Sequence, residues 1–180
     1  SKHIMCPYHA WVFETNGRLR SARGSEQVEG FDKTKVCISQ FKVENFLGFI
    51  FVNLDPNARP MDEVYPGVRE GILELAPDIN DNVYTYHHEK GLNANWKVAV
   101  ENYNECYHCP GVHQTFAQGV VDPKSYKIAP GTNCLLHTAK SQPHGRQAYE
   151  IDLSDPNATK YASFFMWPTF SCQIYPGGVV

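Results

Sequence analysis

The chain has 180 residues, a length typical of one domain or of parts of two. Its 16 Lys and Arg stand against 19 Asp and Glu, and the net charge of -3 excludes the basic footprint of a nucleic-acid-binding protein. Hydrophobic residues make up 42% of the chain and aromatic residues 13%, which excludes a disordered chain and indicates a substantial core. Prolines and glycines interrupt the longest uncharged stretch, 161–180, so no membrane span is predicted.

Six cysteines are spread along the chain, and the first residues lack the apolar run of a signal peptide. We therefore predict a reducing cytoplasm, in which the cysteines are thiols or metal ligands rather than disulfides. Both ends interrupt a pattern, so we expect the chain to be an internal fragment of a longer protein.

The first part of the chain has all-β character. Ala10 to Phe13 predicts a strand, Asn16-Gly17 predicts a hairpin turn, and Arg18 to Arg20 predicts the returning strand. The aromatic and β-branched stretch 41–54 predicts a central strand or a pair of strands, ended by Asp55-Pro56-Asn57.

The pattern of apolar residues changes after Pro60. Apolar residues at near-helical spacing predict one or two short helices within 60–78, and a longer helix is predicted over 95–109, stopped by Pro110-Gly111. Strands are predicted at 83–89, 134–137 and 170–174. The boundary between a β part and an α+β part is expected between 55 and 62.

The first group of candidate ligands is Cys6-Pro7-Tyr8-His9. A thiolate and an imidazole on one tight turn can bind a metal and supply half of a four-ligand site. Taken alone, the pattern is also compatible with a buried cysteine beside an ordinary histidine.

The second group lies at the end of the predicted helix. Glu105 and His108 fall on one face of a helix, and a break at Pro110-Gly111 can swing His113 back beside His108. Two histidines with open positions, and a carboxylate from elsewhere, form the facial triad of non-haem Fe(II) oxygenases.

Other interpretations of this stretch compete with the iron site. Cys106 and Cys109, with His108 and His113, could hold a structural zinc, although four ligands in one helical turn are awkward. The spacing of Glu105 and His108 also occurs in di-iron bundles, but no second Glu-x-x-His exists in the chain. The residues could also be packed helix residues with a polar tip.

The two groups together resemble the α subunit of Rieske-type non-haem iron oxygenases. CPYHAW at 6–11 is similar to the second half of the Rieske CxH…CxxH motif, and NWKVAVENYNECYHCPGVH at 95–113 is similar to the iron motif (D/E)xxHx₄H. The resemblance extends through LGFIFVNLD at 47–55 and covers nearly the whole chain.

The resemblance implies an α+β fold. An all-β Rieske domain part at 1–58 would be followed by a catalytic domain part at 59–180, with an antiparallel sheet flanked by helices. Cys6 and His9 would ligate a [2Fe–2S] cluster and His108 and His113 a mononuclear Fe(II). The remaining cluster ligands and the third iron ligand, a carboxylate, are expected outside the fragment, since Asp152 and Asp155 are not favoured.

Glu105 would be the acid that carries electrons between the two metal centres. Most aromatic-ring dioxygenases have Asp at this position. Glu105, within the sequence ECYHC at 105–109, resembles the subgroup that oxidises carnitine, glycine betaine, choline and stachydrine. The resemblance implies monooxygenation of a quaternary or tertiary ammonium compound, with demethylation or C–N cleavage. Aromatic rings suit such a substrate, and the nearby candidates, each also a candidate for core packing, are Tyr103, Phe116, Phe164, Phe165 and Trp167.

The partners implied are O₂, a small-molecule substrate, a flavin and iron–sulfur reductase that passes on electrons from NAD(P)H, and two further copies of the chain in a homotrimer. No nucleic acid or membrane is expected. The alternatives are an aromatic-ring hydroxylating dioxygenase and a structural zinc-binding protein.

Overall fold

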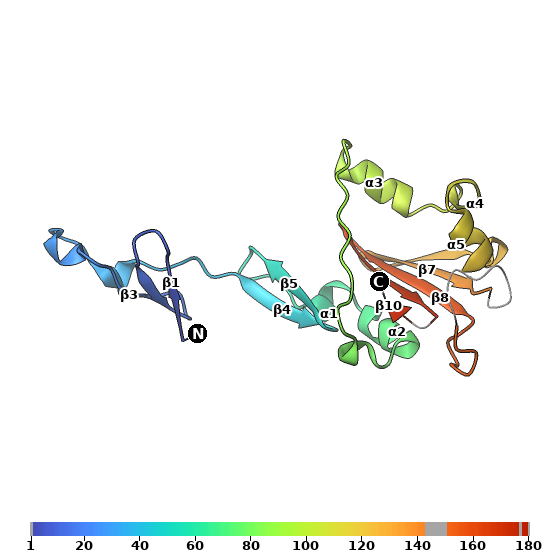
Figure 1. Ribbon diagram of the computed structural model, residues 1–180, viewed down its shortest axis with the longest axis horizontal. Coiled ribbons are helices and arrows are strands. Elements are labelled where there is room, and N and C mark those ends of the chain that lie inside the picture. The colour runs from blue at the N-terminus through green and yellow to red at the C-terminus, as the bar shows by residue number, and fades with distance from the viewer. Residues whose placement is uncertain (1, 143–150, 177, 180) are drawn as a thin grey trace. The chain divides into compact units, whose positions relative to one another are not determined.

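The structure is a computed structural model that describes residues 2–142, 151–176 and 178–179. The chain divides into two compact units, Ser1–Glu44 with Ile50–Ala58 and Asn45–Phe49 with Arg59–Val180. Strands and helices follow one another along the ribbon in Figure 1, and the predicted mixture of helices and antiparallel sheets is confirmed. Among the described residues, no helix combines the length and the apolar character needed to cross a membrane.

The first unit begins with a three-stranded antiparallel sheet of β1 (His3–Met5), β2 (Val12–Glu14) and β3 (Leu19–Ser21). The predicted hairpin between β2 and β3 is confirmed, because the Gly17 N–H donates to the Glu14 carbonyl oxygen at 2.9 Å. Gly17 has φ +86°, and a Cβ there would lie 2.9 Å from the Ile38 carbonyl oxygen. Both the backbone angle and the close approach therefore require glycine.

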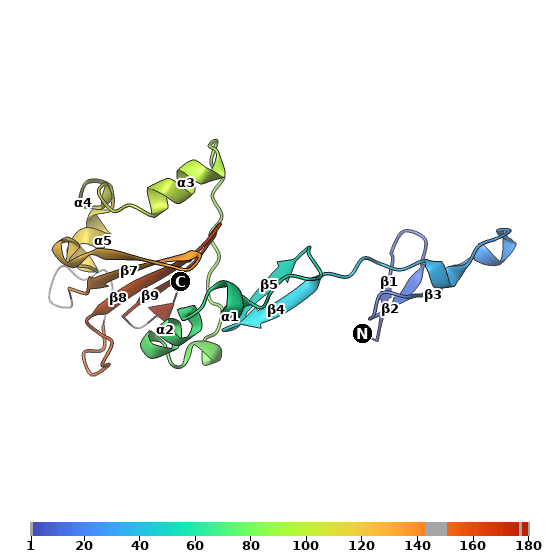
Figure 2. The ribbon, with the colours of Figure 1, turned by 180° about the vertical axis from the view of Figure 1, so that it is seen from behind.

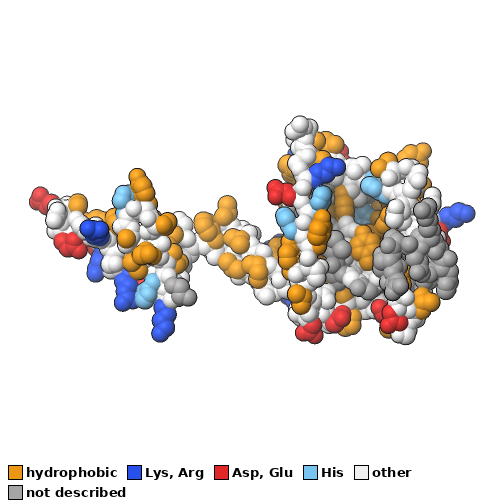
Figure 3. All heavy atoms as spheres, viewed as in Figure 1, with side chains coloured by type: hydrophobic (Ala, Val, Ile, Leu, Met, Phe, Trp, Pro, Cys, Tyr) orange, Lys and Arg blue, Asp and Glu red, His pale blue; other side chains and the backbone are white. Residues whose placement is uncertain are grey.

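The predicted pair of strands within 41–54 is also confirmed, as β4 (Lys42–Phe46) and β5 (Phe49–Asn53). Leu47 and Gly48 both have positive φ, the conformation of a tight hairpin turn. Hydrophobic side chains gather along this hairpin in Figure 3. Val43, Ile50 and Val52 are each more than half exposed. The turn of the hairpin, Asn45–Phe49, belongs to the second unit. The 3₁₀ helices η1 (Ser25–Gln27) and η2 (Lys33–Lys35) lie in the first unit.

The second unit carries the helices of the site. The predicted helices within 60–78 are confirmed as α1 (Met61–Val64) and α2 (Val68–Leu75), and α2 buries Val68 and Ile72, four residues apart. The remaining helical elements in the described part of this unit are η3 (Ile79–Asp81), α3 (Trp96–Tyr103), α4 (Cys109–Val112), α5 (Gln114–Gly119) and η4 (Pro123–Ser125).

Two predictions in this region are wrong. Residues 83–89 form no strand, because their alternating side chains are exposed and no strand in the described part of the chain pairs with them. The helix predicted over 95–109 ends at Tyr103, because the Asn104 side chain donates to the Val100 carbonyl oxygen at 2.8 Å and closes the helix. Pro110 does not stop a helix: it lies in the first turn of α4, where a missing N–H leaves no hydrogen bond unmade.

Five consecutive strands build the main sheet, in the order β10-β9-β8-β7-β6, and every neighbouring pair is antiparallel. The predicted strands at 134–137 and 170–174 are confirmed within it. The strands are β6 (Lys127–Gly131), β7 (Cys134–Lys140), β8 (Lys160–Met166), β9 (Phe170–Tyr175) and β10 (Gly178–Val179). In its centre, Ser163 of β8 pairs with His137 of β7 and Gln173 of β9.

The two faces of this sheet have different neighbours. Figures 1 and 2 show α3, α4 and α5 on one side of the sheet and α2 on the other. Ser163 faces the first group, with its hydroxyl 2.6 Å from the Tyr103 hydroxyl. Phe164 faces α2, because a Cβ on Gly71 would lie 2.8 Å from its ring. Neighbouring residues of β8 therefore pack against helices on opposite faces of the sheet.

Candidate functional site

Helix α3 leads the chain into the site and is fixed at both ends. The Asn95 side chain caps its start by accepting from the Lys97 N–H at 3.0 Å. At its end, the Tyr103 hydroxyl accepts from the Gln173 side-chain amide at 2.8 Å and also contacts the hydroxyls of Ser163 and Ser171. The last turn of α3 is thus tied to β8 and β9.

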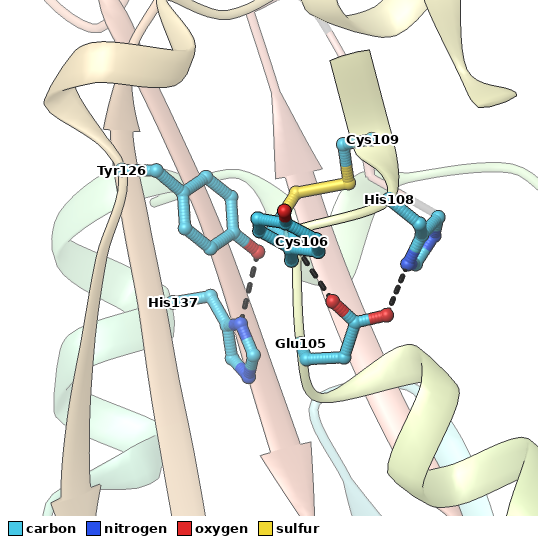
Figure 4. Close-up of a disulfide and its surroundings, with 7 residues drawn as sticks. Glu105, Cys106, His108, Cys109, Tyr126 and His137 are labelled. Atoms are coloured by element: carbon cyan, nitrogen blue, oxygen red, sulfur yellow. Dashed lines mark hydrogen bonds and ion pairs between the residues drawn. A yellow bond between two sulfur atoms is a disulfide. The ribbon is translucent and has the colours of Figure 1, made fainter. Parts of the chain in front are cut away.

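The chain then makes a short turn that brings Glu105 and His108 together. Glu105 Oε1 accepts from His108 Nδ1, and Oε2 accepts from the Tyr107 N–H at 2.6 Å. Figure 4 shows the Glu105 carboxylate pointing toward the His108 ring. The hydrogen bond from His108, assisted by that from Tyr107, holds the pKa of Glu105 below its usual range. The helix predicted for this pair is absent, yet the two side chains meet.

The geometry of His108 leaves one ring nitrogen for a ligand. Because Nδ1 donates to a carboxylate, a neutral His108 ring carries its lone pair on Nε2. His113, between α4 and α5, places its ring 5.0 Å from that of His108, with the planes 72° apart. A carboxylate on the far nitrogen of a histidine is the usual support for a metal ligand. The structure thus brings His108, His113 and Glu105 together.

The prediction that the cysteines are thiols rather than disulfides is wrong for one pair, since Cys106 and Cys109 are joined in a disulfide within the same turn. The Cys109 N–H donates to the Cys106 carbonyl oxygen at 3.2 Å, a turn that leaves the two Cα atoms 5.1 Å apart, within the range a disulfide needs. Sulfurs bonded to each other are not thiolates, so the structural-zinc interpretation of this segment is also wrong. The other four cysteines are free.

The third ligand of a facial triad is not found among the described residues, where no group of three or more His, Cys, Asp or Glu side chains is placed to hold a metal ion. The Asp152 carboxylate accepts from the N–H and the hydroxyl of Ser154 in a local turn. Within the described part of the chain, the donor set therefore fits two of the three ligands of such an iron, the imidazoles of His108 and His113.

A cavity of about 920 Å³ opens beside these histidines. Of the five aromatic residues predicted near the site, Tyr103 and Phe116 line this cavity, Phe164 and Phe165 are buried, and Trp167 is half exposed against Trp96. Among the described residues that line the cavity there is no Lys or Arg, and Glu105 is the one acidic residue. Sequence reasoning missed the residues of its floor, which are Tyr126, Tyr161, Gln173 and Tyr175.

Those floor residues form a connected aromatic and polar surface. The ring of Tyr161 packs against those of Phe116 at 5.3 Å and Tyr175 at 5.2 Å. Burial raises the pKa of Tyr126 to about 12, so its hydroxyl stays protonated at neutral pH. Beneath it, His137 is 1% exposed, and burial lowers the pKa of this imidazole. The alternation of polar Ser171 and Gln173 with apolar Cys172 and Ile174 along β9 was the signal that could have pointed to part of this face.

The other predicted ligands, Cys6 and His9, lie on one tight turn of the first unit. The Ala10 N–H donates to the Cys6 carbonyl oxygen at 3.0 Å, and the Cys6 N–H donates to the Trp11 carbonyl oxygen at 2.8 Å. Ala10 has φ 58°, which turns the chain sharply after His9. Cys6 is a free thiol and His9 is exposed. A free thiol and an exposed imidazole on such a turn fit two ligands of a [2Fe–2S] cluster.

Comparison with known proteins places this mixed fold in a class. Over 98% of the chain, the structure matches a quaternary ammonium Rieske monooxygenase with a TM-score of 0.87 and 33% identity, and it covers 47% of that chain. The match to the Rieske monooxygenase CntA in complex with L-carnitine has a TM-score of 0.79, with 33% identity, 98% of this chain and 45% of that one. The mixed fold of helices and antiparallel sheets therefore matches part of the Rieske oxygenase structures.

Sequence comparison gives the family. Residues 78–180 match the model of the ring hydroxylating alpha subunit (catalytic domain). The carnitine monooxygenase oxygenase subunit of Escherichia coli (strain K12) is 33% identical over 173 residues, 96% of this chain and 45% of the relative. The glycine betaine monooxygenase oxygenase subunit of Chromohalobacter salexigens is 32% identical over 148 residues, 80% of this chain and 32% of the relative.

The chain belongs to the ring hydroxylating alpha subunit family, and the predicted resemblance is confirmed. It spans about half the length of the curated relatives it matches most fully.

Proposed function

We propose that the chain is part of the oxygenase subunit of a Rieske non-haem iron monooxygenase that acts on a quaternary or tertiary ammonium compound. The observation that carries this proposal is the meeting of Glu105, His108 and His113 beside a cavity. The names of the relatives, which are monooxygenases of carnitine, glycine betaine and choline, support the substrate class.

His108 and His113 would hold the mononuclear Fe(II), with a carboxylate from a segment outside these 180 residues as the third ligand. When bound by these residues, such an iron would supply the activation of O₂. This chain would keep Nε2 of His108 available for the metal, because Nδ1 of the same ring donates its hydrogen bond to Glu105. Glu105 thereby orients the ring without taking a ligand position itself.

Residues 1–58 would be the C-terminal part of a Rieske domain and residues 59–180 the N-terminal part of the catalytic domain. The first compact unit of the chain ends at Ala58, which supports the boundary, although Asn45–Phe49 belong to the second unit. Cys6 and His9 would ligate the [2Fe–2S] cluster, together with a Cys and a His supplied by an earlier segment.

Glu105 would be the bridge between the two metal centres across a subunit boundary of a homotrimer. Its carboxylate already accepts from His108, and nearly half of its side chain remains exposed, so a second subunit can reach it. A flavin and iron–sulfur reductase would supply electrons from NAD(P)H, and the protein would work in the cytoplasm.

The lining of the cavity supports a cationic substrate. The faces of Tyr103, Phe116 and Tyr161 offer negative quadrupoles to an ammonium group. No Lys or Arg in the described lining repels it, and the one acidic group there is Glu105. An aromatic hydrocarbon also fits aromatic walls, so the alternative of an aromatic-ring dioxygenase is decided by a substrate panel.

The test uses the full-length parent protein, purified without oxygen. We expect about two irons and two sulfides from the cluster, about one further iron, and a Rieske-type EPR signal after reduction. Adding O₂ with carnitine, glycine betaine or choline should release a demethylated or cleaved amine, and naphthalene should give no diol. Diol formation with no amine turnover would favour the dioxygenase, and zinc in place of iron would overturn the proposal.

Single substitutions test which residues bind the iron. His108→Ala should lose the mononuclear iron and turnover while the cluster absorption stays intact. His88→Ala is the matched control, because His88 lies on the exposed segment before α3 and outside the cavity lining. Normal turnover in His108→Ala would refute the iron assignment.

A further inference from the structure

A buried histidine on the sheet is connected to the residue that precedes Glu105. His137 of β7 is 1% exposed, and both of its ring nitrogens have partners. Nδ1 lies 2.9 Å from the Tyr126 hydroxyl, and Nε2 lies 3.2 Å from Asn104 Oδ1. Figure 4 shows His137 beneath Tyr126, on the sheet below the turn that carries Glu105.

The contacts of Asn104 fix the direction of every hydrogen bond in this chain of groups. Its Nδ2 donates to the Val100 carbonyl oxygen at 2.8 Å, so the atom that faces His137 is the amide oxygen. An oxygen there can only accept, and His137 must therefore carry its hydrogen on Nε2. Nδ1 then has the lone pair and accepts from the Tyr126 hydroxyl. A neutral ring satisfies all partners, in agreement with the lowered pKa of His137.

Asn104 is the point at which the chain leaves α3. Its backbone N–H and its side-chain amide both donate to the Val100 carbonyl oxygen, at 3.0 and 2.8 Å, and its amide oxygen is held by His137. The preceding residue, Tyr103, is tied to β8 and β9. The next residue, Glu105, is exposed, and its carboxylate accepts hydrogen bonds from His108 and Tyr107 within its own turn.

We propose that His137 is a positioning residue, which through Asn104 fixes the backbone from which Glu105 reaches His108. The inference rests on the proposed function, because it concerns the distance over which Glu105 must pass electrons between centres. Displacing a group by about 1 Å can cost two orders of magnitude in rate. The buried imidazole sets that distance from the sheet, although it touches neither metal ligand.

The test compares variants of the full-length holoenzyme. In His137→Leu, single-turnover oxidation of the reduced cluster by O₂ and carnitine should slow by at least about tenfold, while metal content and carnitine affinity stay as in the parent. His137→Gln keeps one donor and one acceptor and should recover most of the rate. Thr138→Ala is the matched control, since Thr138 is the next residue of β7 and points to the opposite face of the sheet.

Asn104→Ala removes the link without changing the buried ring and serves if His137→Leu does not fold. It should slow cluster oxidation to a similar extent, and the double variant should be no slower than either single one, because both act through one contact. In metal-free protein, hydrogen exchange of the amides of residues 105–109 should accelerate in both variants and not in Thr138→Ala.

The outcomes separate two failures. If the parent does not oxidise its cluster on addition of substrate and O₂, the proposed function fails. If the parent does so and both His137→Leu and Asn104→Ala match its rate and its exchange, the positioning role is overturned. Additive slowing in the double variant, or no recovery in His137→Gln, would also overturn it, since the effect would then be a general loss of packing.

Discussion

The close approach of α2 to the sheet makes a clear prediction for Gly71→Ala. In a helix interior, alanine is favoured over glycine by about 0.5 to 1 kcal/mol. Here, however, the new Cβ would lie 2.8 Å from Cε1 and 3.0 Å from Cζ of Phe164. Phe164 is 5% exposed in the central strand β8, between two hydrogen-bonded neighbours, so its ring has little room to move.

Overpacking of such a core costs about 1 to 3 kcal/mol. After the gain in helix propensity is subtracted, Gly71→Ala should lower the free energy of unfolding by roughly 0.5 to 2 kcal/mol. Urea denaturation of the full-length protein checks this as a lower midpoint at unchanged slope. Gly91→Ala is the control, because nothing lies within 4 Å of its Cβ position.

A second substitution tests the cause. Phe164→Leu in the Gly71→Ala background should return part of the lost stability, because it removes the ring atoms that the new methyl group meets. If Gly71→Ala is as stable as the parent or more so, α2 can move away from β8 at no cost. The tight packing described for this face of the sheet would then be refuted.

Three further predictions follow from the site. Burial lowers the pKa of His137, so below about pH 6.5 the unfolded chain binds more protons than the folded chain. The free energy of unfolding should therefore be at its full value above that pH and should fall as the pH drops through it. In His137→Gln, the urea midpoint should fall less over the same pH range. Peptide mapping after alkylation without reductant should leave Cys106 and Cys109 unlabelled, and labelling of both would contradict the disulfide. Tyr103→Phe should lower the unfolding free energy by about 1 to 3 kcal/mol, because the buried Ser163 and the half-buried Gln173 lose the hydroxyl to which they are hydrogen-bonded. Tyr107→Phe is the control, since Tyr107 is fully exposed, and equal urea midpoints for the two variants would count against the hydrogen bonds of Tyr103.

Local chemistry in the sequence predicted much of the fold. The Asn16-Gly17 hairpin needs only a left-handed glycine, and α2 follows from the spacing of Val68 and Ile72. Neither feature depends on a distant partner. The strand predicted at 83–89 failed because alternation is not sufficient: a strand also needs a neighbour to pair with.

The site was predictable in part for the same reason. The pairing of His108 and His113 was predicted from the sequence, and the structure places their rings together. The predicted cause, a helix break at Pro110-Gly111, is wrong, because α4 (Cys109–Val112) lies between the two histidines. The role of His137 was not visible, because it depends on a hydrogen bond between residues 33 positions apart, which only the packing of the end of α3 on the sheet brings together. The end of α3 at Asn104 depends on a local hydrogen bond to Val100, which the helical pattern of the sequence did not indicate.

Neighbouring residues of β8 contact helices on opposite faces of the sheet, Ser163 on the side of α3 and Phe164 on the side of α2, and this limits how the strand can vary in length. Deleting one residue would shift the strand by one position and turn Phe164 toward the cavity and Ser163 toward α2. The hydroxyl that holds Tyr103 would be lost together with the packing on Gly71. Natural relatives should therefore differ in β8 by substitution and place their insertions and deletions in the connections between strands.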